Sequence, residues 1–231
     1  MKAMILAAGR GERMRPLTDH CPKPLLRVGN EPLIGWHIRR LQQVGITDIV
    51  INHAWLGTQI EQTLGNGSQY GVHIAYSPEL SGGLETAGGI ATALPLLGEQ
   101  PFLVINGDVL TDIDFQTAFT AAEILLNEQK MAHLWLVANP PHNQHGDFAL
   151  CTDGLVSSDT ATGEALTFSG MGVYHPALFQ NTPPHQAAKL APLLRQAMNQ
   201  QLISGQKHAG LWLDVGTVER LEEANRLAAD W

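Results

Sequence analysis

Glycines and cations gather where the first apolar run of the sequence ends. Residues 6–18 read LAAGRGERMRPLT, and Lys23 follows between two prolines. Small residues at the end of a strand let backbone N–H groups approach an anion. A glycine-rich turn alone is equally compatible with a purely structural role, but Arg13 and a stiffly held Lys23 favour a site for phosphate groups.

Common phosphate-binding and hydrolytic motifs do not occur in this sequence. Gly9 and Gly11 begin a dinucleotide fingerprint, but Met14 stands where its third glycine belongs. There is no G-x-x-x-x-G-K-[ST] segment, which excludes a P-loop enzyme, and neither H-E-x-x-H nor G-x-S-x-G is present. The cationic segment must therefore bind its anion in another way.

Two aspartates follow apolar runs that read as strands. Asp108 closes the triplet NGD, and Asp214 lies in the segment WLDVGT. Carboxylates at strand ends are natural ligands for a hard cation. Either aspartate alone would more often be a turn or cap residue, the role we expect for Asp112 and Asp114. Together with a cationic glycine-rich segment, Asp108 and Asp214 indicate a site for Mg²⁺ and phosphates.

The elements that must position these residues follow an alternating pattern. Apolar runs alternate with helical patterns, which predicts an α/β fold with one Rossmann-like, doubly wound, mainly parallel sheet. From 139 to 175 the pattern changes to short strands, which predicts a small antiparallel flap. We expect helix 86–97 to break near Pro95. The expected strands are 2–7, 48–52, 72–76, 101–106, 132–138, 148–151, 168–174 and 210–215, and the expected helices are 32–44, 55–64, 86–97, 114–129, 189–200 and 218–229.

Composition and charge limit the partners of the chain. The 231 residues carry a net charge of -8 and are 44% hydrophobic, as in an ordinary globular domain. The first 40 residues hold eight cations against three anions, so the remainder is strongly acidic. This distribution argues against nucleic acid and favours one small polyanion. No apolar run approaches the roughly 18–20 residues of a membrane span, and no signal-peptide pattern is present, so we expect no membrane partner and a cytoplasmic location.

Other charged or reactive residues carry no predicted chemistry. Arg39 and Arg40 fit the solvated face of a helix, and His142 and His145 lie in a polar stretch that we expect to face solvent. The two cysteines are too few for a disulfide framework and lack metal-ligand spacing. The sequence leaves the oligomeric state open.

Four motifs, in order along nearly the whole chain, carry a resemblance to a known family. They are LAAGRGER at 6–13, PKPLL at 22–26, GD at 107–108 and WLDVGT at 212–217. With them the chain resembles the sugar-1-phosphate nucleotidyltransferases. Three further segments resemble, within that family, the uridylyltransferases that act on N-acetylmuramate α-1-phosphate in peptidoglycan recycling: INHAWLG at 51–57, LETAGGI at 84–90 and HGDF at 145–148.

The resemblance implies one enzymatic domain, 1–231, with a nucleotide-binding half at about 1–110 and a sugar-binding half at about 111–231. Its substrates would be UTP and a sugar 1-phosphate, and Asp108 and Asp214 would hold Mg²⁺. Arg13 would stabilise the departing pyrophosphate and Lys23 the reacting phosphates, so Arg13, Lys23 and Asp108 would be catalytic. The implied nucleotide-binding residues are Ala8, Gly9, Gly11, Glu12, Arg13, Lys23, Glu79, Gly83 and Asn106, and the implied sugar-binding residues are Gly146, Asp147, Ser169 and Gly170.

Two departures from the family pattern bear on substrate and activity. The Glu-Lys-Pro triplet with which many relatives grip the sugar phosphate is absent, since residues 159–170 contain no lysine. The chain also lacks the carboxyl-terminal left-handed β-helix of the bifunctional acetyltransferase relatives, so we expect a single activity.

The residues leave several alternatives open. The sugar could be glucose, mannose or N-acetylglucosamine 1-phosphate, and Glu79 could accept a ring N–H of uracil or of guanine. A non-catalytic sugar-nucleotide sensor and a plain binding domain are the other classes, and the presence of Arg13, Lys23 and both aspartates argues against them. The lactyl carboxylate of N-acetylmuramate would need a donor or cation. The sequence alone does not place any of the available cations at the sugar: Lys130, Lys189, Arg195, Lys207, Arg220 and Arg226.

Overall fold

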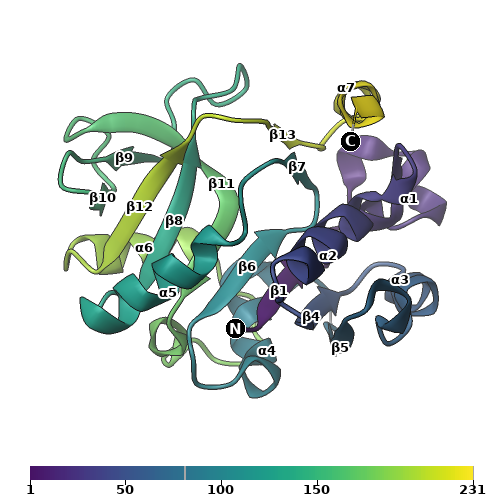
Figure 1. The fold of residues 1–231 in the computed structure, drawn as a ribbon, viewed down its shortest axis with the longest axis horizontal. Helices are drawn as coiled ribbons and strands as arrows, with labels where there is room; N and C mark the ends of the chain where they lie inside the picture. The colour runs from purple at the N-terminus through teal and green to yellow at the C-terminus, as the bar shows by residue number, and fades with distance from the viewer. Residues whose placement is uncertain (81, 231) are drawn as a thin grey trace.

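The computed structural model describes residues 1–80 and 82–230, and within them a nine-stranded sheet forms the centre of the molecule (Figure 1). Its strands are β1 (Ala3–Leu6), β4 (Asp48–His53), β5 (His73–Pro78), β6 (Phe102–Asn106), β8 (Ala132–Val137), β9 (Phe148–Leu150), β10 (Val156–Ser157), β11 (Glu164–Tyr174) and β12 (Ile203–His208). The main path runs β10-β9-β11-β6-β1-β4-β5, while β8 pairs with β11 and β12 with β8. Two small pairs lie apart: β2 (Arg27–Val28) with β3 (Glu31–Pro32), and β7 (Val109–Thr111) with β13 (Trp212–Asp214).

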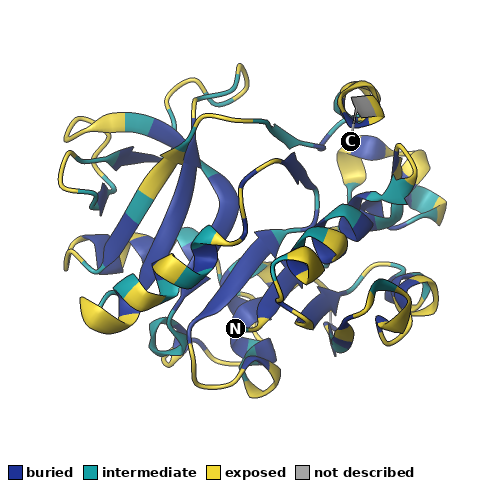
Figure 2. Ribbon diagram, viewed as in Figure 1, coloured by how far each residue is buried: buried dark blue, intermediate teal, exposed yellow. Residues whose placement is uncertain are grey.

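Helices flank both faces of this sheet. They are α2 (Leu33–Gln43), α3 (Gly57–Leu64), α4 (Glu85–Leu97), α5 (Thr117–Asn127) and α6 (Leu190–Met198). The short helix α1 (Leu17–His20) and helix α7 (Val218–Leu227) lie apart from this sheet, and α7 packs beside β2 and β13 (Figure 1). Ala3 and Ile5 of β1 pack into one apolar cluster with α2, α3 and α5, whereas Met4 packs into a second with α4 and α6. A strand buried on both faces must be continuously apolar, as β1 is. Figure 2 shows the buried residues along the central strands.

The half of the sheet that ends at β5 is parallel, and β11 reverses the direction beyond it. β1 runs parallel to β4 and β6, and β4 runs parallel to β5. β11 is antiparallel to β6, β8 and β9, and Met171 pairs with Ile105 near the end of β6. The earlier residues of β11 therefore extend past the carboxyl end of β6, where they pair with β9. The α/β class and the antiparallel flap are confirmed.

One expectation about a single element is wrong, and one strand of the sheet was not expected. Helix α4 continues through Pro95 to Leu97. Pro95 lies in the last turn, and the buried face formed by Ile90, Ala93 and Leu97 keeps that turn packed. Strand β12 was not expected, because its sequence ISGQKH has no apolar alternation; it lies at an edge and pairs along its length with β8.

Arg40 is not solvated. Its guanidinium donates hydrogen bonds to the carbonyl oxygens of Thr111 and Ile113, the latter at 2.6 Å, and lies 4.6 Å from the centre of the Phe115 ring. A flat, multiply donating cation suits such a half-buried place between α2 and the segment after β7. Arg39 behaves as expected, since it is exposed and pairs with Glu31.

A third and smaller apolar cluster joins segments from the two ends of the chain. Met14 packs there with Val215 and with Ala224 of α7. The side-chain oxygen of Asn225 also accepts the Gly29 N–H at 2.9 Å. Helix α7 is therefore docked on the segment that carries the cationic glycine-rich turn.

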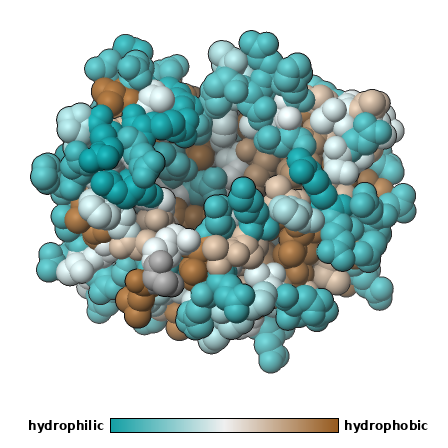
Figure 3. Space-filling model, turned by 180° about the vertical axis from the view of Figure 1, so that it is seen from behind, coloured by the Kyte–Doolittle hydropathy of each residue, from teal (hydrophilic) through white to brown (hydrophobic). Residues whose placement is uncertain are grey.

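The face of the molecule opposite to that of Figure 1 is mostly polar. Figure 3, the view from behind, shows hydrophilic residues over most of that face, with apolar atoms scattered instead of gathered in one patch. None of the helices in the described ranges has both the length and the apolar character needed to span a membrane.

Buried His37 should make the protein less stable in acid. Burial, reinforced by the nearby Arg40 charge, lowers the pKa of His37 from 6.5 to about 4. The unfolded chain therefore takes up a proton below pH 6.5 that the folded chain refuses until about pH 4, so acidification favours unfolding across that window. We expect a loss of about 2 kcal/mol between pH 7 and pH 5 from this residue.

The measurement is the free energy of urea unfolding against pH for the wild type and for His37→Met. The variant should have the shallower slope between pH 7 and pH 5, whatever its absolute stability. His133, whose pKa burial also lowers, contributes equally to both proteins. Identical slopes would show that His37 does not titrate as described.

Candidate active site

The carboxyl ends of the parallel strands surround a cavity of about 400 Å³. Ligands of open α/β sheets bind at this edge. Its walls come from the segment after β1, the ends of β4 and β6, the start of α4 and the turn at Lys23. They include Ala8, Gly9, Lys23, Asn52, Glu79, Gly83, Asn106 and Asp108. Apart from Asn52, each of these is a residue that the sequence predicts for the nucleotide, the metal or catalysis.

A buried hydrogen-bonded pair, Asn52 and Glu79, fixes one side of this cavity. The side-chain oxygen of Asn52 accepts the Ala7 N–H at 2.9 Å, and its Nδ2 donates to Glu79 Oε1 at 2.7 Å. Glu79 Oε2 accepts the Leu84 N–H at 2.6 Å. Gly89 of α4 lies so close that a Cβ there would be 2.6 Å from Glu79 Oε1. The pair thus joins the ends of β1, β4 and β5 to the start of α4.

The glycine-rich turn places Arg13 against the segment that follows β13. Gly11 has φ 68°, a conformation that favours glycine, and it opens a short 3₁₀ turn. Glu12 and Arg13 are exposed in this turn, while Met14 is buried in the third apolar cluster. A Cβ at Gly216 would be 3.0 Å from Arg13 Nη2. Gly11, Glu12 and Arg13 lie outside the lining of the 400 Å³ cavity, although their neighbours Gly9 and Arg10 belong to it.

The two aspartates predicted to bind metal stand on neighbouring backbone segments. In the β7–β13 pair, Asp214 lies opposite Val109. The next residue, Val215, donates its N–H to the carbonyl oxygen of Asp108 at 2.8 Å. Residues more than one hundred positions apart are therefore held on adjacent segments of the backbone.

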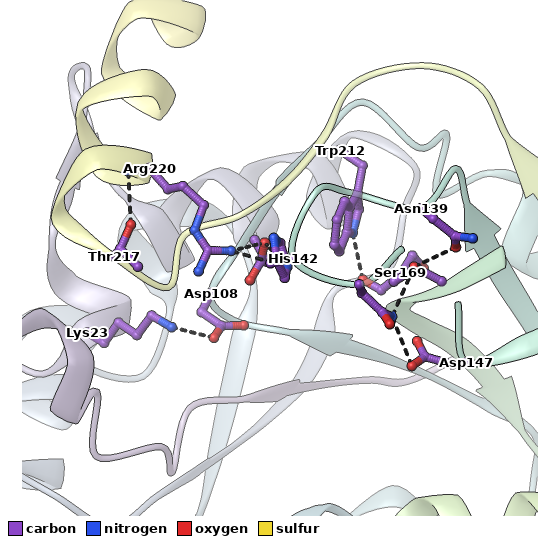
Figure 4. A network of polar contacts seen from close by, with 12 residues as sticks. Lys23, Asp108, Asn139, His142, Asp147, Ser169, Trp212, Thr217 and Arg220 are labelled. Atoms are coloured by element: carbon purple, nitrogen blue, oxygen red, sulfur yellow. Dashed lines mark hydrogen bonds and ion pairs between the residues drawn. The ribbon is translucent and has the colours of Figure 1, made fainter. Parts of the chain in front are cut away.

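Cationic side chains contact both carboxylates (Figure 4). Lys23 Nζ lies 2.6 Å from Asp108 Oδ2, and Arg220 of α7 forms an ion pair with Asp214 Oδ1. His142 is exposed, as expected, but its Nε2 also lies 3.4 Å from the same Asp214 oxygen. Arg220 is a site residue that the sequence analysis did not place. The signal for it was present, since it stands one turn into the helix expected after Asp214.

The donor set of this site fits a hard divalent cation. Two carboxylates supply oxygen ligands, and the contacts to Lys23 and Arg220 engage Asp108 Oδ2 and Asp214 Oδ1. Mg²⁺ is commonly held by one or two carboxylates, with water and substrate phosphates completing its shell. The described residues form no group of three or more His, Cys, Asp or Glu side chains that would hold a metal by themselves.

A second cavity of about 340 Å³ adjoins the first. Leu6, Glu85, Thr86 and Asn106 line both, so the two cavities share a wall. The second is lined further by the flap, by the end of β11 and by α6, through Asp147, Phe148, Phe168, Gly170, Tyr174, Lys189, Leu190, Ala191, Leu194 and Arg195.

The sequence-predicted sugar residues divide into two groups. Asp147 and Gly170 line the second cavity, and Asp147 is fixed because its carboxylate accepts the Phe168 N–H at 2.8 Å. Gly146 and Ser169 are outside its lining. Ser169 is buried, and its carbonyl oxygen accepts the Trp212 indole N–H at 2.8 Å, which ties β11 to β13 (Figure 4).

A mixed α/β sheet with a cation- and carboxylate-lined cleft at its carboxyl edge defines a class of nucleotide-transferring enzymes. The chain belongs to the nucleotidyl transferase family, whose profile matches residues 2–230. Enzymes of this family act on nucleoside triphosphates and sugar 1-phosphates and generally use a divalent metal.

Two relatives and one solved structure are similar to this chain over nearly its whole length. The chain is 67% identical over 231 residues to the N-acetylmuramate alpha-1-phosphate uridylyltransferase of Neisseria meningitidis serogroup B, with 100% of both chains covered. It is 32% identical over 234 residues to the protein of that name from Caulobacter vibrioides, covering 98% of this chain and 96% of the other. A Bacillus anthracis protein crystallised with sucrose matches with a TM-score of 0.85 and 24% identity, covering 100% and 96% of the chains, which shows the fold.

Removal of the Glu79 carboxylate should destabilise the protein measurably. Glu79→Ala leaves the Asn52 amide and the Leu84 N–H without their buried acceptors, and each loss of this kind costs about 1–3 kcal/mol. We expect the free energy of urea unfolding to fall by about 2–4 kcal/mol. Glu99→Ala, which removes an exposed carboxylate, is the matched control. If both variants unfold alike, the Asn52–Glu79 pair does not fix this edge.

Proposed function

We propose that this chain condenses UTP with N-acetylmuramic acid α-1-phosphate, giving UDP-N-acetylmuramic acid and pyrophosphate, in the recycling of peptidoglycan in the cytoplasm. The observation that carries the proposal is the 67% identity, over the whole of both chains, to the Neisseria meningitidis uridylyltransferase. In this proposal residues 1–231 act as one domain, with the nucleotide held by about the first 110 residues and the sugar mainly by the rest.

The two adjoining cavities support the binding of each substrate in a cavity of its own. The uracil would lie in the 400 Å³ cavity against Ala8, Gly9, Glu79 and Gly83, with Asn106 beside the ribose. The triphosphate would follow Gly11, Glu12 and Arg13. The sugar would occupy the 340 Å³ cavity, where Asp147 and Gly170 line the wall. Gly146 and Ser169 would contribute as the residues that precede them in the chain.

The proposed reaction requires compensation of phosphate charge and alignment of the two substrates, and it requires no general base. The attacking group is a phosphate oxygen of the sugar 1-phosphate, which is already ionised at neutral pH, so no side chain has to remove a proton. The shared wall at Asn106 and Thr86 brings two polyanions into neighbouring cavities. Holding reactants in line is then the first contribution of the protein.

The cations beside the carboxylates supply the second contribution. Lys23, next to Asp108 at the rim of the first cavity, would neutralise the reacting phosphates, and Arg13 would stabilise the departing pyrophosphate. Asp108 and Asp214 would hold Mg²⁺, which when bound polarises phosphate oxygens and screens their charge. These cations stand in a chain that is otherwise acidic, so charge complementary to the substrate is concentrated at the site.

Substrate identity is tested by pyrophosphate release from a panel of nucleoside triphosphates and sugar 1-phosphates with Mg²⁺. We expect the fastest release with UTP and N-acetylmuramic acid α-1-phosphate. A preference for glucose, mannose or N-acetylglucosamine 1-phosphate would contradict the proposed sugar while leaving the reaction class intact. Binding of UTP without release from any pair would favour a non-catalytic sensor.

The roles of Lys23 and Asp108 are tested by Lys23→Ala and Asp108→Ala. Each removes a group that stabilises charge in the transition state, and such losses lower the rate by about 10²–10³. Turnover is measured alongside thermal unfolding, because both variants should keep the fold. Asp112→Ala is the matched control, since Asp112 pairs with His208 outside both cavities. Near-normal turnover in either variant would remove that residue from the mechanism.

A further inference from the structure

Two cations that line the second cavity have no side-chain partner among the residues that the structure describes. Among the cations beyond residue 40, Lys130 donates to a backbone carbonyl, Lys207 pairs with Glu164, and Arg220 pairs with Asp214. Lys189 and Arg195 form no side-chain hydrogen bond or ion pair with any residue in the described ranges, yet both line the 340 Å³ cavity. They are two of the six cations beyond residue 40 that could not be placed at the sugar from the sequence alone. In the fold both line the same cavity.

The rest of that wall is largely apolar. Phe148, Leu190 and Leu194 are buried and line the cavity with Phe168 and Tyr174. Lys189 and Arg195 are themselves exposed, so they meet this apolar surface from its solvent side. Lys189 is also the residue before the first turn of α6, where the helix dipole adds positive potential. An anion with an apolar part complements this wall.

The acidic residues of the cavity leave the two cations available. The Asp147 carboxylate is already engaged, since it accepts hydrogen bonds from Asn143 Nδ2 at 3.0 Å and from the Phe168 N–H. Glu85 lies in the wall that both cavities share, and it forms no ion pair with Lys189 or Arg195 in the described structure. In the described structure, therefore, neither of these acids forms an ion pair with the two cations.

We propose that Lys189 and Arg195 bind the carboxylate of an acidic substituent on the sugar, and so select an acidic sugar 1-phosphate over a neutral one. The proposal rests on the proposed function, in which the sugar carries a lactyl ether with one methyl group and one carboxylate. The methyl group would pack on the aromatic and leucine wall, and the carboxylate would meet the two cations. The phosphate of the same substrate is assigned to Lys23, which lines the other cavity.

The test separates the two anionic ends of the substrate. Lys189→Met, Arg195→Met and the double variant are assayed for kcat/KM with N-acetylmuramic acid α-1-phosphate and with N-acetylglucosamine α-1-phosphate, which has the same phosphate but no lactyl group. The matched control is Arg226→Met, which removes an exposed cation of α7 that lines neither cavity.

We expect each single variant to lose about 10-fold or more with the acidic sugar, and the double variant about 100-fold, as for lost hydrogen bonds to a charged group. Turnover of N-acetylglucosamine α-1-phosphate should stay within about twofold of the wild type. Equal losses with both sugars would overturn the proposal, because the cations would then serve the phosphate. No loss with either sugar would show that they are solvated surface charges.

A binding arm keeps the proposal independent of turnover. With a non-hydrolysable UTP analogue present, isothermal titration compares the two sugar 1-phosphates on the wild type and the double variant. If the wild type turns over neither sugar, the proposed function fails. Tighter binding of the acidic sugar by the wild type alone would then still support Lys189 and Arg195, and equal binding by both proteins would refute their role.

Discussion

The pairing of β7 with β13 is the constraint on which the site depends. It sets Asp108 and Asp214 on adjacent backbone segments, and each carboxylate has a cation of its own. Lys23 arrives from the amino-terminal segment and Arg220 from α7. The charge asymmetry of the sequence has a structural meaning in this light, because the cationic first 40 residues supply one side of an otherwise acidic fold.

The same arrangement explains why the glycine-rich turn depends on distant residues. Met14 anchors the turn in an apolar cluster with Val215 and α7, and the packing of Arg13 on Gly216 follows from that anchor. On the other side of the cleft, Asn52 and Glu79 lock the strand ends to α4. The cavity floor is thus fixed by apolar packing at one end and by buried hydrogen bonds at the other.

The sequence predicted the elements whose signals are local. The continuous apolar run of β1 revealed a strand buried on both faces, and the helical stripe of α2 was equally plain. β12 escaped because an edge strand needs no apolar alternation, and Arg40 was misjudged because its acceptors lie some seventy residues away on another element. Long-range packing decided both cases.

For the candidate site, motifs located the residues and the fold supplied their partners. Lys23, Asp108 and Asp214 could be singled out as candidates because each follows an apolar run or stands between prolines, and the family resemblance supplied their expected roles. Asn52, His142 and Arg220 were not, because their relevance lies in contacts across the chain. Lys189 and Arg195 could be read from the sequence, but their place at the second cavity depends on how α6 packs beside the flap.

The docking of α7 on the amino-terminal segment has a consequence for the order in which the protein becomes functional during synthesis. The partners of Met14, Gly29 and Asp214 on this helix are Ala224, Asn225 and Arg220, all near the far end of the sequence. A ribosome makes these residues long after it has made the glycine-rich turn. The nascent chain can therefore form its parallel strands early, but the turn gains its support only after α7 has emerged.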